Sequence, residues 1–236
     1  MDIAGSTALV TGANRGIGRH FAQQLVQRGA AKVYATARRP HLVDVPGVEV
    51  LALDITDPDS VAAAAAVADD VTLLVNNAGS NTFSNLVTGD LAAVRLDVET
   101  HFFGTLHMVR AFAPVLAAGG GGAIVNVLSA LSWFAYDGVN AYAAAKAAEW
   151  SLTNGVRLEL AGQGTLVTGV HLGSADTDMV AAFDIDKIDP ADVARAALDG
   201  VEAGAIEVLV DDAAREVKAS LAGDPAAFYG LGVPAA

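Results

Sequence analysis

Near its start the chain reads Thr11-Gly12-Ala13-Asn14-Arg15-Gly16-Ile17-Gly18, a glycine-rich turn between an apolar run at 7–11 and a helical run at 16–28. We expect a buried strand at 7–11 and a helix that Gly29 ends. Glycines in such a turn let the backbone approach a phosphate closely, and the unpaired N–H groups of the next helix attract it. Because the turn follows a strand and opens a helix, it predicts nucleotide binding rather than a plain structural turn. The residues expected to hold the nucleotide are Gly12, Asn14, Arg15, Gly16, Ile17 and Gly18.

Strands and helices alternate along the rest of the chain. Further strands are predicted at 32–36, 48–53, 71–76, 123–128, 166–172 and 206–210, and helices from Pro58 onward and at 91–118, 140–160 and 190–202. Repeated strand–helix units predict an α/β fold, here a doubly wound, seven-stranded parallel sheet with helices on both faces, formed as one domain over residues 1–236. Ligands of such sheets bind beyond the carboxyl ends of the strands, where the strand order reverses.

The composition is that of a densely packed protein. Of 236 residues, 53% are hydrophobic and 17% are charged, which fits one large domain. Because cysteine is absent, no disulfide framework and no thiolate metal site are expected, and we predict no metal. No apolar run reaches the roughly 18 residues that span a bilayer, and residues 1–5 lack the pattern of a secretory signal. A cytoplasmic protein without membrane partners is the expectation.

The net charge is −13, from 27 acidic and 14 basic residues, and it opposes general affinity for nucleic acid or anionic lipid. We therefore expect a small-molecule ligand, held by local basic residues if it is anionic. Arg38 and Arg39 follow the second predicted strand, where a carboxylate would bind the ribose of NAD and repel the extra phosphate of NADP. Guanidinium groups suit that phosphate. The pattern predicts NADP(H), with solvated loop charges as the alternative.

Tyr142 and Lys146 lie four residues apart in the predicted helix at 140–160, so their side chains can point into the same space. A phenol has a pKa of about 10, and a nearby cation lowers it towards the range useful for proton transfer. Ser129 would add a hydrogen bond to a developing oxyanion. Such a pair also occurs by chance on solvated helices, and the nucleotide loop is what favours the catalytic interpretation.

Together these motifs resemble one family. The glycine loop, Asn76-Asn77-Ala78-Gly79, Ser129 and Tyr142-x-x-x-Lys146 resemble the motifs of short-chain dehydrogenases/reductases, in that family's order and over about residues 3–210. The resemblance implies a Rossmann-type fold and hydride transfer between NADP(H) and a carbonyl or alcohol. It implies that Tyr142 protonates the carbonyl oxygen, that Lys146 lowers the tyrosine pKa and binds the nicotinamide ribose, and that Ser129 polarises the carbonyl. The further cofactor contacts that it implies are Asp54, Ile55, Asn76, Ala78, Gly79, Gly173, Ala175 and Thr177.

The chain departs from the family pattern at two places. His101 stands where the family has an asparagine that supports a proton relay, so we expect either a modified relay or a histidine packed for structural reasons. Leu172-Gly173 replaces the usual Pro-Gly pair, and Ala175 replaces a β-branched residue, which predicts looser positioning of the cofactor. The segment 179–187 is short for a substrate-covering loop and predicts an open or shallow lid.

The expected substrate pocket is apolar and carries little charge, which favours a hydrophobic ketone or aldehyde. Its predicted lining is Leu131, Trp133, Phe134, Val139, Leu172 and Met179, although several of these could instead pack in the core. The leading hypothesis is an NADP(H)-dependent carbonyl reductase, reversible as an alcohol dehydrogenase. The alternatives are a catalytically silent NADP(H)-binding regulatory or scaffold protein, and a family enzyme that runs oxidation with NAD. The family also implies a homodimer or homotetramer.

Overall fold

Seven strands lie in one parallel sheet within residues 1–231, the part of the chain that the computed structural model describes. Their order is β3-β2-β1-β4-β5-β6-β7, so the direction of winding reverses between β1 and β4. The predicted Rossmann-type doubly wound fold is confirmed. The predicted domain extends to residue 236, and residues 232–236 lie outside the described part. The strands are β1 (Thr7–Thr11), β2 (Lys32–Ala37), β3 (Glu49–Ala52), β4 (Leu73–Asn76), β5 (Gly122–Val127), β6 (Thr165–His171) and β7 (Glu207–Leu209).

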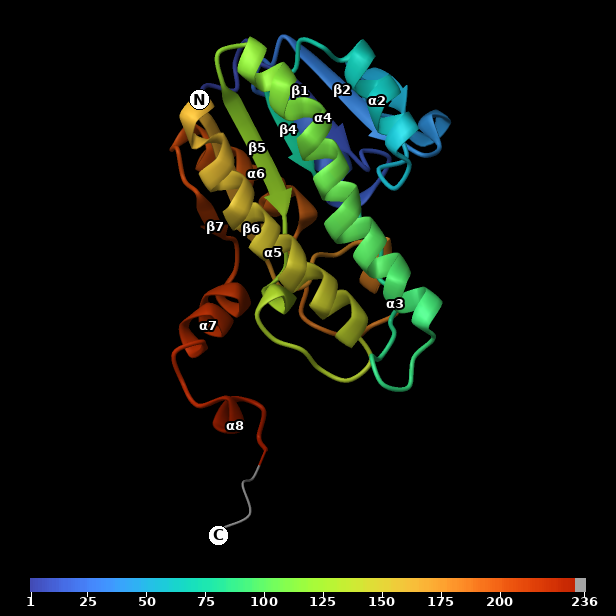
Figure 1. The fold of residues 1–236 in the computed structure, drawn as a ribbon, viewed down its shortest axis with the longest axis vertical. Helices are drawn as coiled ribbons and strands as arrows, with labels where there is room; N and C mark the ends of the chain where they lie inside the picture. Colours follow the sequence, from blue (N-terminus) through green and yellow to red (C-terminus); the bar gives the residue numbers. More distant parts are fainter. Residues whose placement is uncertain (232–236) are drawn as a thin grey trace.

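Helices cover both faces of the sheet (Figure 1). One face carries α1 (Gly16–Gln27) and α6 (Pro190–Glu202). The opposite face carries α2 (Pro58–Val67), α4 (Thr105–Ala118) and α5 (Asn140–Leu160), with α4 and α5 running side by side. Each layer buries its own apolar cluster against the sheet, so the inner strands are shielded from water on both sides while the edge strand β3 stays largely exposed.

The strand sequences explain this arrangement. Successive side chains of a strand point to opposite faces, and in β1 Ala8 and Val10 join the cluster under α1 and α6 while Leu9 joins the one under α2 and α4. All three are fully buried. Because both faces must be apolar, the strand reads as a continuous apolar run, and its bounds could be predicted from the sequence.

The helical region predicted at 91–118 is present without a break, but it is not a regular α-helix over its whole length. It consists of α3 (Leu91–Val98), a π-helical segment (Glu99–Gly104) and α4. At Gly104 a Cβ would lie 2.8 Å from Cδ1 of Ile55, so glycine permits close packing here. Wide turns of this kind occur mostly as local bulges, often at functional sites. Here the bulge contains His101, which is buried.

The last two helices of the described residues leave the sheet edge and extend away from the body (Figure 1). They are α7 (Asp212–Ser220) and α8 (Pro225–Phe228), and short 3₁₀ turns occur at Pro40–Leu42, Ala130–Ser132, Ala161–Gln163 and Asp178–Val180. Asp211 caps α7, since its Oδ1 accepts from the amide of Ala214 at 2.9 Å. No helix in the described residues is both long and apolar enough to cross a membrane.

Candidate active site

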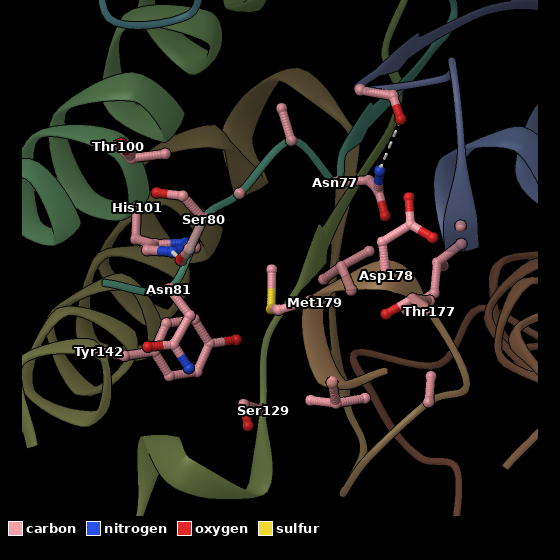
Figure 2. A pocket seen from close by; sticks show the side chains of 18 of the residues that line it. Asn77, Ser80, Asn81, Thr100, His101, Ser129, Tyr142, Thr177, Asp178 and Met179 are labelled. Carbon is pink, nitrogen blue, oxygen red and sulfur yellow. Dashed lines mark hydrogen bonds between the residues drawn. The ribbon is translucent and has the colours of Figure 1, made fainter. Parts of the chain in front are cut away.

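A cavity of about 790 Å³ lies at the carboxyl edge of the sheet, where the winding reverses. Figure 2 shows Tyr142 and His101 on one side, Thr177 and Asp178 on the other, and Ser129 and Met179 between them. The structure brings most of the predicted site residues to this cavity. Those that line it are Gly12, Asn14, Arg15, Gly16, Ile17, Arg38, Arg39, Asp54, Ile55, Ala78, Gly79, His101, Ser129, Leu131, Val139, Tyr142, Lys146, Leu172, Gly173, Ala175, Thr177 and Met179.

The glycine loop is held tightly against the end of β4. Gly12 has a φ of 67°, and a Cβ on it would lie 2.9 Å from Cα of Ala78, so both conformation and space require glycine. Thr11 Oγ1 accepts from the amides of Asn77 and Ala78, each at 2.9 Å. The Asn77 side chain donates back to the Thr11 carbonyl at 2.9 Å. The start of α1 lines the cavity beside this loop, so its unpaired N–H groups suit a phosphate.

Three guanidinium groups lie at the same end of the cavity. Arg38 and Arg39 line it directly after β2, and Arg15 lines it from the glycine loop. Arg15 pairs with Asp178 at 3.2 Å, with both side chains largely exposed. The carboxylate after β3, Asp54, accepts from Thr56 N at 3.0 Å and from Thr56 Oγ1 at 2.7 Å. This end of the cavity fits a phosphorylated nucleotide, because the glycine loop, the start of α1 and the three arginines all line it.

Ser129 follows β5 and is fixed by the turn that it begins. Its Oγ accepts from the amide of Leu131 at 3.1 Å, and its own amide donates to Ser132 Oγ at 3.4 Å, a reciprocal cap of the 3₁₀ turn. Its carbonyl accepts from His171 Nδ1 at 3.1 Å. The backbone of Ser129 is therefore held from two sides, and its hydroxyl stays at the cavity wall.

Tyr142 and Lys146 share the cavity face of α5, as the spacing predicted. Lys146 is 5% exposed, and its Nζ lies 5.8 Å from the centre of the Tyr142 ring. That Nζ donates to the carbonyl of Val127 at 2.8 Å and to Glu149 Oε2 at 2.6 Å. The ammonium is thus held in one place by the end of β5 and by a carboxylate one turn further along the helix.

The phenol is a weaker acid than the sequence predicted. Desolvation raises the pKa of Tyr142 above its ordinary value of 10, and the opposing effects of Lys146 and Ser129 do not reverse it. Burial alone would lower the pKa of Lys146, but Glu149 and Tyr142 outweigh it and raise that pKa. Burial also raises the pKa of Glu149, against the effect of Lys146. The expected lowering of the Tyr142 pKa is missing because desolvation outweighs the effect of the Lys146 cation, and the Glu149 carboxylate acts in the same direction as desolvation.

His101 packs directly against Tyr142. The two rings stand edge to face with centroids 5.0 Å apart, and His101 Nε2 lies 2.6 Å from the carbonyl oxygen of Ser80. A Cβ on Gly79 would lie 2.6 Å from His101 Cε1, so the neighbouring glycine makes room for the imidazole. Burial lowers the pKa of His101 well below its ordinary value, and the ring is therefore neutral near pH 7.

The segment after β6 is fixed from outside the cavity, although it lacks the Pro-Gly pair. The amide of Gly173 donates to Asp211 Oδ2 at 2.8 Å, and the Leu172 carbonyl accepts from Ala130 N at 2.8 Å. Ala175 pairs with Ile188 across the base of the lid. Asp211 thereby supplies a constraint that the sequence pattern did not predict.

Four predicted residues do not line the cavity. Gly18 packs beneath the loop against the Gly12 carbonyl, and Asn76 of β4 donates to Oδ1 of its buried neighbour Asn126 in β5 at 2.9 Å. Trp133 stacks on His171 with ring centroids 3.9 Å apart. Phe134 packs towards α8, 6.0 Å from the ring of Phe228. The turn at Ala130–Ser132 directs both aromatic rings away from the cavity, which corrects their predicted place in the substrate pocket.

Other residues of the site were not predicted. Phe83, Tyr136, Phe183 and Ile185 line the apolar end of the cavity, and Phe83 and Phe183 lie with ring centroids 5.3 Å apart. Phe83 is the one non-glycine residue among 1–231 with a positive φ, 51°. Glu149 was missed although its spacing from Lys146 was a usable signal, because three residues along a helix place two side chains on one face. The described residues contain no group of three His, Asp or Glu side chains able to hold a metal.

Comparison with known proteins gives one consistent result. The family model for short chain dehydrogenase matches residues 6–188. An uncharacterized oxidoreductase of Staphylococcus saprophyticus is 29% identical over 214 residues, which cover 84% of this chain and 92% of that protein. A short-chain dehydrogenase of Penicillium ochrochloron is 34% identical over 181 residues, which cover 72% of this chain and 66% of that protein.

A solved structure agrees over almost the whole length. The crystal structure of a short chain dehydrogenase from Burkholderia cenocepacia, in complex with NADP, matches with a TM-score of 0.93 and 40% identity. The match covers 99% of this chain and 100% of that one.

Proposed function

Because this chain belongs to the short-chain dehydrogenase family of oxidoreductases, we propose that it is an NADP(H)-dependent carbonyl reductase, reversible as an alcohol dehydrogenase. The observation that carries the proposal is the convergence of Ser129, Tyr142 and Lys146 on the cavity that the glycine loop also lines. NADPH would supply the hydride, and the protein orients the two reactants.

The residues take the following roles in reduction. Tyr142 gives its proton to the carbonyl oxygen, and its raised pKa keeps the phenol protonated near neutral pH. The Ser129 hydroxyl donates a hydrogen bond to the same oxygen as negative charge develops. Lys146 has one N–H beyond those given to Val127 and Glu149, and it is available for the nicotinamide ribose on the cavity side.

NADP(H) is favoured over NAD(H) by the end of the cavity that holds the arginines. Arg15, Arg38 and Arg39 line it, and β2 is followed by Arg38 and Arg39 instead of a carboxylate. The short chain dehydrogenase from Burkholderia cenocepacia, which is 40% identical to this chain, was crystallised in complex with NADP. A planar, permanently charged fork of donors suits the additional phosphate. Gly12 and the start of α1 would hold the pyrophosphate.

The other end of the cavity favours an apolar substrate. The apolar residues that line it are Leu131, Val139, Leu172, Met179, Phe83, Phe183 and Tyr136. All three lining arginines lie at the nucleotide end, and Asp137 at the substrate end is hydrogen-bonded by Asn85 at 2.7 Å. Among the described lining residues the lysine and arginine side chains are Lys146 and these three arginines, all assigned above to the cofactor, so they leave no further cation for a substrate carboxylate or phosphate. We propose a hydrophobic ketone or aldehyde, or the corresponding secondary alcohol.

The test is NADPH consumption with a panel of aryl and alkyl ketones, with chiral analysis of the products. We expect turnover in the intact protein, and a loss of about 10²-fold or more in Tyr142→Phe while NADPH binding persists. A protein that binds NADPH and reduces no carbonyl would instead be the silent binding protein. That alternative is not favoured, because it leaves the three converging side chains without a use.

We also propose a homodimer or homotetramer, as the family resemblance implies. The support in the chain is the small residue Ala144, exposed on α5, together with the exposed Leu158 further along the same helix. Light scattering on the purified protein tests this, and a monomer at micromolar concentration would refute it.

A further inference from the structure

A carboxylate lies buried behind the catalytic lysine. Glu149 is 2% exposed and follows Tyr142 and Lys146 on the same face of α5. Charged side chains are rarely buried to this degree unless they are paired. None of the roles proposed above uses this carboxylate.

Both oxygens of Glu149 are held in place. Oε2 accepts from Lys146 Nζ at 2.6 Å, and Oε1 accepts from Thr105 Oγ1 at 2.8 Å. Thr105 begins α4, directly after the π-helical segment. The carboxylate therefore connects the catalytic helix to the bulged central helix, and it holds Lys146 against the Val127 carbonyl.

His101 faces this carboxylate from the bulge. Its Nε2 must donate to the Ser80 carbonyl, because a carbonyl oxygen can only accept. In the neutral ring Nδ1 then carries no proton, and its lone pair is free to accept. Nδ1 lies 3.8 Å from Glu149 Oε2. Nδ1 has no hydrogen-bond partner among the described residues. Histidine and glutamate thus meet directly behind Tyr142 and Lys146.

We propose that Glu149 is a positioning residue that fixes the Lys146 ammonium and offsets its charge, and that it acts as one unit with His101, which stands where the resembling family has its relay asparagine. The inference rests on the proposed function, since it requires Tyr142 and Lys146 to act in catalysis. The expected consequence is that Tyr142 stays protonated to a higher pH than Lys146 alone would allow.

The charges around the phenol support this consequence. The titratable groups that face it are Asp97 from α3, His101 from the bulge, and Lys146 and Glu149 from α5, while His171 of β6 binds the Ser129 carbonyl. Of these, Lys146 lowers the pKa of Tyr142, whereas Glu149 and then Asp97 raise it. A negative charge beside a phenolate disfavours the phenolate. Removing the Glu149 charge should therefore make Tyr142 more acidic.

Two substitutions separate charge from position. Glu149→Gln keeps the shape and removes the charge, and we expect the alkaline limb of ketone reduction to move to lower pH by about one unit. Glu149→Asp keeps the charge but withdraws it from Lys146. We expect kcat to fall about tenfold while the alkaline limb of the pH profile stays at the same pH. Glu159→Gln, exposed on the same helix, is the matched control and leaves both unchanged. A folded Glu149→Gln protein with an unmoved limb would overturn the proposal.

A measurement without turnover keeps this test independent of the proposed function. Tyrosine labelled with ¹³C at Cζ gives one NMR resonance for each of the four tyrosines, and Tyr142→Phe assigns that of Tyr142. We expect the titration midpoint of Tyr142 to fall in Glu149→Gln. If the midpoint falls but the parent protein reduces no ketone, the role of Glu149 is supported and only the proposed function is refuted. An unchanged midpoint, with turnover intact in the parent protein, would sink the role of Glu149 alone.

His101 supplies the second arm of the test. Combining His101→Asn with Glu149→Gln should give a smaller loss of kcat than the product of the two single losses, because the groups act as one unit. Independent, multiplying effects would show that His101 is only a packed structural residue and would contradict its part in the proposal.

Discussion

Acid should destabilise this protein through His171, the last residue of β6. Its ring is 1% exposed and stacks on Trp133. Nδ1 donates to the Ser129 carbonyl at 3.1 Å, which leaves the lone pair at Nε2 without a partner among the described residues. Protonation would place a charge in this apolar wall. Burial accordingly lowers the pKa of His171 to about 4 from an ordinary value of 6.5.

The size of the effect follows from these two pKa values. The unfolded chain takes up a proton near pH 6.5, and the folded chain resists it down to about pH 4. Stability that is present above pH 6.5 is therefore lost as the pH falls through this window. At about 1.4 kcal/mol per pH unit, the contribution of His171 is about 2 kcal/mol by pH 5 and about 3 kcal/mol by pH 4.

Urea unfolding followed by circular dichroism measures this loss. His171→Asn keeps a donor for the Ser129 carbonyl and removes the titrating ring. Its free energy of unfolding, relative to that of the parent protein, should therefore rise by about 2 kcal/mol between pH 7.5 and pH 5. Glu149, whose pKa is raised, acts in the opposite direction but is present in both proteins and cancels. His41→Asn, at an exposed position, controls for removal of an imidazole. Parallel curves for His171→Asn and the parent protein would refute the assignment.

Three further substitutions test the cavity. Arg38→Ala should lower kcat/KM with NADPH by about tenfold or more and leave NADH unaffected; equal losses with both cofactors would remove Arg38 from phosphate binding. Asp211→Asn keeps a residue able to cap α7 but withdraws the charged acceptor from Gly173, so the Kd for NADPH by fluorescence titration should rise about fivefold, and an unchanged Kd would show that the contact is dispensable. Phe83→Ala should raise KM for aryl ketones by about tenfold and spare small alkyl ketones; a uniform change would point to a general disturbance of the lid.

The parts of this fold that were predictable are encoded locally. The residues of β1 are apolar on both faces, and Gly12 has a conformation that favours glycine, so the strand, the turn and the helix could be predicted from neighbouring positions alone. The helical repeat alone predicted that Tyr142 and Lys146 share one face of α5. Predicted bounds of the strands agree with the structure to within two residues for the same reason.

The parts that were not predictable depend on packing between distant segments. Glu149 acquires its role from Thr105, 44 positions away, and the bulge around His101 depends on its contact with Gly79. Trp133 and Phe134 were misplaced because a single 3₁₀ turn decides which way they point. The pKa of Tyr142 depends on desolvation by the whole wall of the cavity, and no spacing of residues indicates that quantity.

The buried charged side chains around Tyr142 influence its protonation state. Lys146 is the only lysine or arginine classed as buried within residues 1–231, and the buried carboxylates of Glu149 and Asp97 both act on the same phenol. Oxidation of an alcohol needs Tyr142 as a phenolate, which two carboxylates disfavour, whereas reduction of a carbonyl needs the protonated phenol, which they preserve. Because both carboxylates are fixed by hydrogen bonds, from Thr105 and from Thr82 at 2.6 Å, this bias is built into the fold. Together with desolvation, these charges favour the protonated form of Tyr142, which is the form that its proposed role as proton donor requires.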